Sequence, residues 1–292
     1  MMNGIINIYK EKGFTSFDVV AKLRGILKTR RIGHTGTLDP DAEGVLPVCI
    51  GKATKICELL TDKTKEYEAV MLLGRTTDTQ DVTGETQTQQ EVRCSAKEVE
   101  KAVLSFVGDY MQVPPMYSAL KVNGKKLYEL AREGKTVERK PRPVHFYEIE
   151  ILDIDFPLVR FRVTCSKGTY IRTLCHDIGE KLGCGAAMET LLRTKVGRFT
   201  LDDAITLAQT EEAVRNGEIE QRILGIEEIL AEYPRVCCRE EGDRLLANGN
   251  PLVQALVNAE EKDGWIRMCN SDGSFAGVYQ WDEKRNRYFP VK

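Results

Sequence analysis

The amino-acid sequence predicts an α+β protein with two units, and three observations support this prediction. Strand-like runs with a two-residue period and helix-like runs with a period of three to four residues both occur along the chain. A chain of 292 residues is long enough for two domains. After Tyr233-Pro234, short strand-like runs and tight turns replace the helical pattern, so we expect a domain boundary near residue 232.

The composition is that of an ordinary globular protein, with 42% hydrophobic and 29% charged residues. The net charge of -2 excludes a uniformly basic nucleic-acid binder, so any nucleic-acid surface must be a local patch. No apolar run approaches the roughly 20 residues of a membrane span, and the N-terminus lacks the pattern of a signal peptide. Nine scattered cysteines and three histidines lack zinc-site spacing and are typical of a cytoplasmic protein with reduced thiols and no metal.

The first 60 residues predict two strands, at 4–9 and 45–51, and two helices. Residues 53–60 form the shorter helix. Ser16 is typical of the N-cap of the longer helix, because an apolar stripe at helical spacing follows it. That stripe consists of Val19, Val20, Leu23, Ile26 and Leu27.

The loop at residues 33–44 joins these elements and is rich in glycine. Glycine is unfavourable inside a helix or strand but permits tight turns and close backbone approach. Pro40 biases the preceding Asp39 toward an extended conformation. The loop therefore presents His34 and Asp39 at defined angles. The alternative is a surface turn in which Asp39 only caps a backbone N–H.

The middle of the chain predicts a strand at 65–74, in which Tyr67 shares one face with every second residue. Ser95 and Glu98 have the spacing of a capping box before a second clear helix. A strictly alternating strand follows at 158–166.

Residues 121–143 form the clearest basic segment, with eight Lys or Arg against three Glu, a local excess of +5. Tyr117 and Tyr128 are interleaved with these charges. Such a segment suits a phosphate backbone with stacking side chains nearby. The alternative is a solvated surface loop.

Thr169 is placed to cap the next helix, and Arg172 falls in its first turn. A cation there opposes the helix dipole, so Arg172 needs a carboxylate partner unless it is an ordinary surface residue. A further helix is predicted through Met188, Leu191 and Leu192, and residues 200–231 are predicted to be acidic and helical.

Asp39, Tyr67 and Arg172 each lie at the end of a predicted element beside a glycine-containing turn, and the motifs around them resemble those of TruB-family tRNA pseudouridine synthases. Four matching blocks occur in family order over most of the chain: residues 33–40 with Ala42, Gly44, Leu46 and Pro47; 65–67 leading to 73–79; 114–121; and 165–172. Leu191 and residues 196–199 add to the match. There are two departures: Tyr9-Lys10-Glu11 replaces Asp-Lys-Pro, and Leu192 replaces a second Arg.

The resemblance implies a pseudouridine synthase fold, with a mixed, mainly antiparallel central sheet flanked by helices. Residues 1–232 would form the catalytic domain, with an RNA-binding insertion at about 121–143, and residues 233–292 a small β-rich PUA-like RNA-binding domain. The implied activity is isomerisation of uridine 55 in the tRNA T-loop to pseudouridine, by base flipping and without a cofactor. The implied partner is the T-arm of tRNA, and we expect a monomer.

The resemblance also assigns roles to individual residues. Asp39 would be the nucleophile, Arg172 would keep it ionised, and Tyr67 would stack on the uracil and help remove the C5 proton. Leu191 would form an apolar wall, and His34 would fill the space that the flipped base leaves, although an acid–base role for His34 is the alternative. The order of bond making stays open between attack on C6, attack on C1′ and a glycal route. RNA contacts are expected from Lys121, Lys125, Lys126 and Lys135.

Two other classes of protein compete with this interpretation. A catalytically idle RNA-binding protein or RNA chaperone would not need Asp39, Tyr67 and Arg172 together. A hydrolase or phosphotransferase with an aspartate nucleophile would need a phosphate-binding glycine loop with Lys, or a metal-binding carboxylate cluster, and the sequence has neither.

Overall fold

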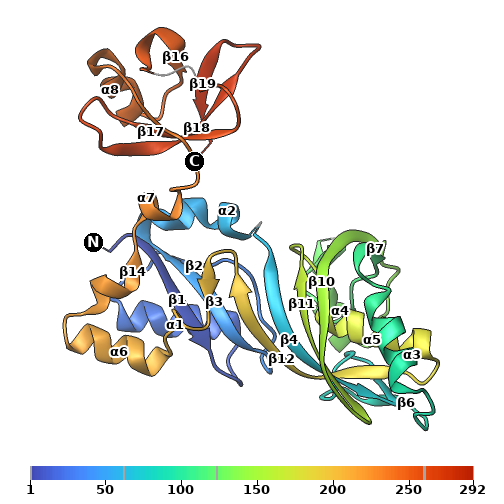
Figure 1. The fold of residues 1–292 in the computed structure, drawn as a ribbon. Coiled ribbons are helices and arrows are strands. Elements are labelled where there is room, and N and C mark those ends of the chain that lie inside the picture. The colour runs from blue at the N-terminus through green and yellow to red at the C-terminus, as the bar shows by residue number, and fades with distance from the viewer. Residues whose placement is uncertain (1, 62, 123, 259–260, 292) are drawn as a thin grey trace.

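The computed structural model describes residues 2–61, 63–122, 124–258 and 261–291, and these form two β-sheets with helices packed on them (Figure 1). Over these residues the larger sheet has ten strands and the smaller sheet five. Neighbouring strands of the larger sheet are antiparallel except β3 and β12, which are parallel. The predicted α+β class and the mixed, mainly antiparallel sheet are confirmed.

Most strands of the larger sheet lie side by side along one continuous path. Its spatial order is β14 (Ile223–Leu224), β1 (Gly4–Lys10), β3 (Glu43–Ile50), β12 (Ala186–Val196), β4 (Lys65–Leu73), β11 (Leu158–Cys165), β10 (Arg142–Asp155) and β7 (Gly108–Gln112). Two short strands lie off this path, β2 (Ile32–His34) on β3 and β13 (Phe199–Thr200) on β12. Two hairpins stand apart, β5 (Arg75–Thr77) with β6 (Thr86–Gln89), and β8 (Lys121–Val122) with β9 (Lys125–Lys126).

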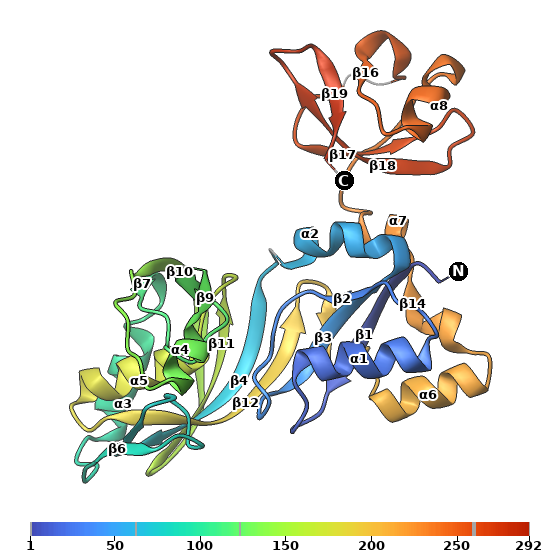
Figure 2. The same cartoon turned by 180° about the vertical axis from the view of Figure 1, so that it is seen from behind.

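Helices cover the two halves of this sheet separately. Helices α1 (Ser16–Ile26) and α6 (Leu207–Arg215) pack beside β1 and β3 around one apolar cluster (Figure 2). Helices α3 (Ala96–Leu104) and α5 (Ile171–Leu182) pack against β4, β10 and β11 around another. The remaining helices are short: η1 (Gly51–Ile56), α2 (Cys57–Thr61), α4 (Leu127–Arg132), η2 (Ile219–Arg222) and α7 (Ile226–Ile229).

Two helix starts differ from the sequence prediction by one residue. The N-cap of α1 is Thr15, which forms a capping box with Asp18. Ser16 is buried instead, and its hydroxyl group bonds the main chain of Leu38. In α5 the N-cap is Tyr170 rather than Thr169.

The predicted helix through residues 188–192 is wrong, because this segment belongs to strand β12. Hydrogen bonding to β4 and β3 on its two sides keeps the segment extended. The pairing with β4 is irregular between Met188 and Thr190 and again between Arg193 and Lys195. Such a bulge shifts the inward face by one residue, so buried positions recur at helix-like spacing.

The acidic region at residues 200–231 is only partly helical. Helix α6 ends at Arg215, before Gly217, which has a left-handed backbone with φ of 74°. The rest of the region contains η2, β14 and α7, and β14 pairs with β1.

The C-terminal unit is a separate, curled five-stranded sheet beyond α7 (Figure 1), and Val278 of this sheet shares an apolar cluster with β1 and β3 of the larger sheet. Its order is β15 (Arg235–Cys237), β17 (Trp265–Cys269), β18 (Phe275–Asp282), β19 (Arg287–Pro290) and β16 (Leu252–Val253), with α8 (Glu240–Ala247) and η3 (Gln254–Leu256). It has an apolar core of its own, around Met268 and Tyr279. The predicted β-rich C-terminal unit is confirmed and is consistent with a PUA-like fold, whereas the boundary at residue 232 stays a prediction.

Within the described ranges, no helix has the length and apolar character that crossing a membrane would require.

Strand β3 approaches β12 so closely that Gly44 has no room for a side chain. Its φ is 108°, and an added Cβ would overlap the carbonyl oxygen of Arg193. Gly13 has a φ of 87° but open space around it. A side chain at position 13 would therefore meet backbone strain without overlap, which makes Gly13 a control for Gly44.

We expect Gly44→Ala to lower the free energy of unfolding by about 3 kcal/mol, because strain and overlap add. Gly13→Ala should cost only about 1 kcal/mol from strain. Urea unfolding followed by circular dichroism measures both. Equal losses would show that the approach of β3 to β12 adds nothing.

Candidate active site

The loop that carries Asp39 lies between β2 and β3, and its main chain is held on both sides of that residue. The Leu38 N–H donates to the Ser16 hydroxyl at 2.8 Å, and that hydroxyl donates to the Leu38 carbonyl at 3.3 Å. The Pro40 carbonyl accepts from the Lys10 ammonium at 3.1 Å and from the Gly13 N–H at 2.9 Å. The loop is therefore ordered by bonds to its backbone, which leaves the Asp39 side chain free for other contacts.

Asp39 forms an ion pair with Arg172 in the first turn of α5. The Arg172 Nε lies 2.9 Å from the Asp39 Oδ2, and the exposed fractions of the two side chains are 5% and 41%. The buried guanidinium thus holds a carboxylate that stays open to a substrate. This contact supplies the carboxylate partner that the sequence analysis expects for Arg172.

Burial is the strongest influence on Asp39 and raises its pKa above the ordinary value. The Arg172 cation opposes this change, and the Asp81 carboxylate adds to it. The net effect of these influences is a raised pKa of Asp39. Arg172 therefore offsets only part of the free-energy cost of burying the ionised carboxylate.

The rest of the Arg172 guanidinium joins two other segments to the Asp39 loop. Its Nη1 donates to the Thr79 carbonyl at 2.8 Å and lies 3.4 Å from the Asp81 Oδ2. Its Nη2 donates to the Tyr117 carbonyl at 2.9 Å. Sequence reasoning missed Asp81, although it lies in the polar loop after β4.

Tyr67 lies on the buried face of β4, in the same apolar cluster as Leu38 and Leu191. Burial raises its pKa to about 12, so it is a neutral phenol at neutral pH. Leu191 is on the neighbouring strand β12 and is almost fully buried. Asp39 and Arg172 are therefore paired directly, Asp39 is near enough to Tyr67 to add to the rise in the pKa of its hydroxyl, and Leu191 shares the apolar cluster of the tyrosine.

Two buried cations near the loop were not predicted as site residues. Lys10, which the sequence analysis noted only as part of a departure, is fully buried, and burial lowers its pKa to about 8. Arg193 is 1% exposed and donates to the main chain of the Asp39 loop. An alternating strand pattern cannot identify such residues, because Lys and Arg are ordinarily assigned to the solvent face.

His34 lies at the end of β2, with its side chain partly exposed. Its Nδ1 accepts from the Gly36 N–H at 3.3 Å, and its carbonyl accepts from the Cys57 thiol at 3.1 Å. Burial lowers the pKa of His34, so the ring is neutral at neutral pH. Within the part of the chain that the structure describes, no hydrogen bond or ion pair joins His34 to Asp39.

Comparisons with known proteins identify the family of this chain. A family model described as "TruB family pseudouridylate synthase (N terminal domain)" matches residues 24–171. A second, "tRNA pseudouridylate synthase B C-terminal domain", matches residues 172–231. The chain belongs to the TruB family.

Relatives of the TruB chain match it over its full length. The protein named tRNA pseudouridine synthase B from Lachnoclostridium phytofermentans is 54% identical, covering 100% of this chain and 99% of the relative. The protein of the same name from Clostridium novyi is 53% identical and covers 95% of each. These relatives confirm the family that the sequence motifs suggested, and with it a pseudouridine synthase.

Solved structures confirm the pseudouridine synthase fold of the TruB chain. A Cbf5-Nop10-Gar1 complex contains a chain 29% identical, with a TM-score of 0.72, covering 95% of this chain and 78% of that one. An H/ACA RNP bound to a substrate RNA containing 2'-deoxyuridine contains a chain 26% identical, with a TM-score of 0.71, covering 97% and 80%.

The basic segment of this TruB chain, apart from residue 123, consists of the β8–β9 hairpin, α4 and the stretch up to β10. Lys125 and Lys135 are more than half exposed and both lie near Glu133, at 3.7 and 2.7 Å. The segment bonds the preceding stretch through the N–H groups of Leu127 and Tyr128, and in that stretch the Tyr117 carbonyl accepts from Arg172.

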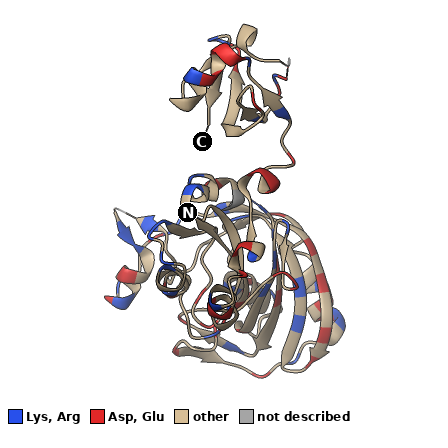
Figure 3. Cartoon of the chain, turned by 90° about the vertical axis from the view of Figure 1, so that its left-hand side faces the viewer, with Lys and Arg blue, Asp and Glu red and all other residues tan. Residues whose placement is uncertain are grey.

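Elsewhere on the TruB fold, charges of both signs are interspersed. Figure 3 shows basic and acidic bands alternating along the strands at the right of the view. On the large sheet, Glu68 pairs with Arg160 and Arg162 at 2.7 and 2.8 Å. Such mutually paired charges leave little net field for a polyanion.

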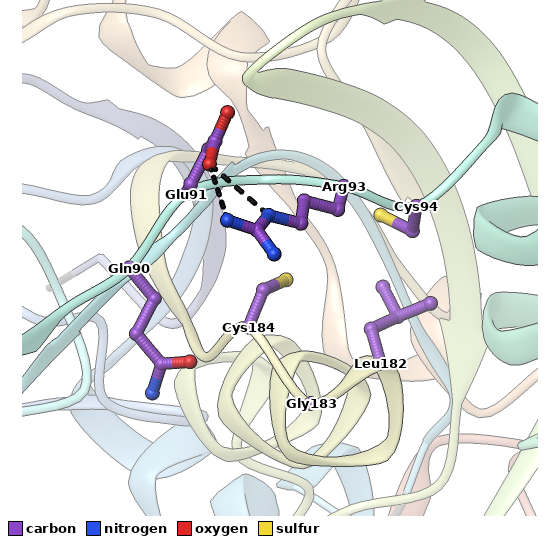
Figure 4. Close-up of a pocket in the computed structure, with 7 residues that line it drawn as sticks. All are labelled: Gln90, Glu91, Arg93, Cys94, Leu182, Gly183 and Cys184. Carbon is purple, nitrogen blue, oxygen red and sulfur yellow. Dashed lines mark hydrogen bonds and ion pairs between the residues drawn. The ribbon is translucent and has the colours of Figure 1, made fainter.

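A cavity of about 300 Å³ lies at the far end of α5 from Arg172 (Figure 4). Its lining residues are Gln90, Glu91, Arg93, Cys94, Leu182, Gly183 and Cys184. They include none of the site residues named above, so this cavity is separate from the candidate active site. Among the described residues, no group of three or more His, Cys, Asp and Glu is placed to hold a metal ion.

We expect Asp81→Asn to lower the pKa of Asp39, because it removes a negative charge that favours the protonated carboxyl and frees Arg172 for Asp39. The Asp39 pKa can be followed by NMR titration of protein labelled with ¹³C in its aspartate carboxyl groups. Asp41→Asn is the matched control on the exposed side of the loop and should leave that pKa unchanged. An Asp39 pKa that stays constant or rises in Asp81→Asn would contradict the assignment.

Proposed function

We propose that this TruB-family enzyme isomerises uridine 55 in the T-loop of tRNA to pseudouridine, with Asp39 as the nucleophile. Its full-length relatives carry the name tRNA pseudouridine synthase B, which supports tRNA as the substrate. The observation that carries the proposal is the ion pair between a partly exposed Asp39 and a buried Arg172.

The reaction needs a base to leave the ribose and return through another atom. The C1′–N1 bond breaks, the uracil rotates, and a new bond forms between C5 and C1′. The C5 proton is lost and N1 gains one, so the product is an isomer of the substrate. Asp39 acts in the ionised form, by attack on C1′, by attack on C6, or by a glycal route, and all three need a carboxylate at this position.

Arg172 acts through Asp39. Because burial raises the pKa of Asp39, its ionised form depends on the cation beside it. The guanidinium also fixes the direction of the carboxylate, since its other nitrogens are held by main-chain carbonyls.

Tyr67 and Leu191 provide the apolar surroundings of the base. Tyr67 meets the uracil as a neutral phenol, because its pKa of about 12 lies far above neutral pH. Its ring serves as a stacking surface, and its hydroxyl group relays the C5 proton, accepting that proton on oxygen as it gives up its own. Leu191 limits escape of the detached base.

The target nucleotide has to be flipped out of the folded T-arm, which costs a few kcal/mol of unstacking. We propose that His34 braces the vacated space. Its neutral ring already accepts the Gly36 N–H through Nδ1, so Nε2 remains for the RNA. This partner favours the bracing role over an acid–base role.

The RNA backbone is proposed to contact the segment at residues 121–143 through Lys121, Lys125, Lys126 and Lys135. The C-terminal unit contributes to RNA binding by its shape rather than by its charge. Residues 233–292 contain nine Lys or Arg and nine Asp or Glu, a net charge of zero. The enzyme acts on the T-arm as a cytoplasmic monomer.

We expect Asp39→Asn to reduce pseudouridine formation by at least about 10⁴-fold, because the amide is no nucleophile. Its affinity for tRNA should be nearly unchanged. The thermal midpoint should not fall, since the ionised carboxylate is disfavoured by burial. Mass-spectrometric mapping of pseudouridine in an unmodified tRNA transcript measures the product.

Asp41→Asn is the control within the same loop and should keep wild-type activity. Full activity of Asp39→Asn would refute the mechanism, and product at a position other than 55 would refute the proposed specificity. An RNA-binding protein without catalysis would give no product even from the wild-type chain.

Reversing the charge of Lys125, Lys126 and Lys135 should weaken tRNA binding. The slope of log K against log salt concentration should fall by about 1 for each phosphate group that the variant no longer binds. Filter binding at several salt concentrations tests this. The same reversal at Lys97, Lys101 and Lys181, on the outer helices, is the matched control. Equal affinities for both triple variants would return residues 121–143 to the solvated-loop interpretation.

A further inference from the structure

We propose that Arg193 is a positioning residue, whose guanidinium joins the main chain of the Asp39 loop to Tyr67 and so sets the spacing between nucleophile and base platform. This inference rests on the proposed function, because it concerns how far apart those two groups are held.

Arg193 lies at the junction of the two strands that carry the site. In the pairing of β12 with β4 it is opposite Tyr67, and in the parallel pairing of β12 with β3 it is opposite Gly44. The missing side chain at Gly44 allows this close approach. Arg193 is therefore the residue of β12 from which both halves of the site can be reached.

Its side chain uses every nitrogen on the segments around Asp39. The Nε donates to the Val45 carbonyl at 2.7 Å, after the loop. The Nη2 donates to the Gly36 carbonyl at 3.2 Å, and the Nη1 lies 3.5 Å from the Thr37 carbonyl, before Asp39. Tyr67 is directly opposite Arg193 in the pairing of β4 with β12, and the guanidinium opposes the rise that burial causes in the pKa of the Tyr67 hydroxyl. One planar group thus binds the main chain on both sides of Asp39, and its residue lies opposite the tyrosine on the neighbouring strand.

Burying the Arg193 cation costs free energy, which only its hydrogen bonds can offset. Its side chain is 1% exposed, and among the described residues no carboxylate lies within ion-pair distance of it. A buried cation without a counter-ion is disfavoured, and a similar apolar residue would often be more stable. The hydrogen bonds from Arg193 to the main-chain carbonyls of the Asp39 loop, and its place beside Tyr67, offset this cost.

The fork shape of the side chain is essential to this role. Arginine presents donors in a fixed plane, whereas lysine presents one compact charge. A lysine at position 193 keeps a cation near Tyr67 but cannot reach Val45 and Gly36 together. The two substitutions Arg193→Lys and Arg193→Met therefore separate geometry from charge.

The test compares these variants with wild type for kcat and KM on unmodified tRNA. We expect kcat to fall on the order of 10²-fold in Arg193→Met, because a displacement of about 1 Å can cost that much. Arg193→Lys should fall between Arg193→Met and wild type, and KM should change little in both. The control is Arg162→Met on the neighbouring strand β11, where Arg162 is partly exposed and pairs with Glu68 and Glu150. It should keep wild-type kcat.

A double-mutant cycle with Tyr67→Phe tests the link to the tyrosine. If Arg193 acts partly through the Tyr67 hydroxyl, the loss in kcat from Arg193→Lys should be smaller in the Tyr67→Phe background. Circular dichroism establishes the folded fraction, and Arg193→Lys carries the test if Arg193→Met does not fold.

Wild-type kcat in folded Arg193→Lys would overturn the inference. So would a loss that appears only in KM, equals the loss of folded protein, or is fully additive with Tyr67→Phe. A wild-type enzyme that forms no pseudouridine in tRNA would instead overturn the proposed function, which keeps the two failures distinct.

Discussion

The ion pair between Asp39 and Arg172 is the interaction on which the arrangement of the site depends. A single buried guanidinium holds the Asp39 carboxylate and two main-chain carbonyls, from Thr79 and Tyr117. Three segments that are remote in sequence therefore meet at one side chain. Since the carboxylate remains 41% exposed while its partner is buried, the pair combines a fixed geometry with access for a substrate.

The side chains that hold the Asp39 loop in this geometry lower the stability of the fold. Lys10 and Arg193 are buried cations that bond loop carbonyls, and burial lowers the pKa of both. Burying a charge is unfavourable, so these two residues lower the stability of the fold. The apolar clusters on either side offset this loss. Active sites commonly combine such local penalties with stability supplied elsewhere.

Much of the fold follows from local pattern. The alternation in β4 and β11 and the capping box before α3 predict those elements, because each is a short-range property of the chain. Strand β12 was missed because its bulges imitate helical spacing. At the candidate site, the motifs predict Asp39, Tyr67 and Arg172, whereas the bonds of Ser16, Asp81 and Arg193 around the Asp39 loop cannot be read from the sequence. Their importance comes from tertiary partners, which no spacing in the sequence encodes.

The position of β12 between β3 and β4 also has a consequence for synthesis of the protein. Arg193 and the Val45 carbonyl that it bonds are 148 residues apart. A ribosome therefore releases the Asp39 loop long before the strand that completes the sheet around it. Until β12 emerges, β3 and β4 have no common neighbour, so the nascent chain holds a glycine-rich loop with unpaired strand edges. Contacts of such long range also make folding slow, which lengthens this exposed interval.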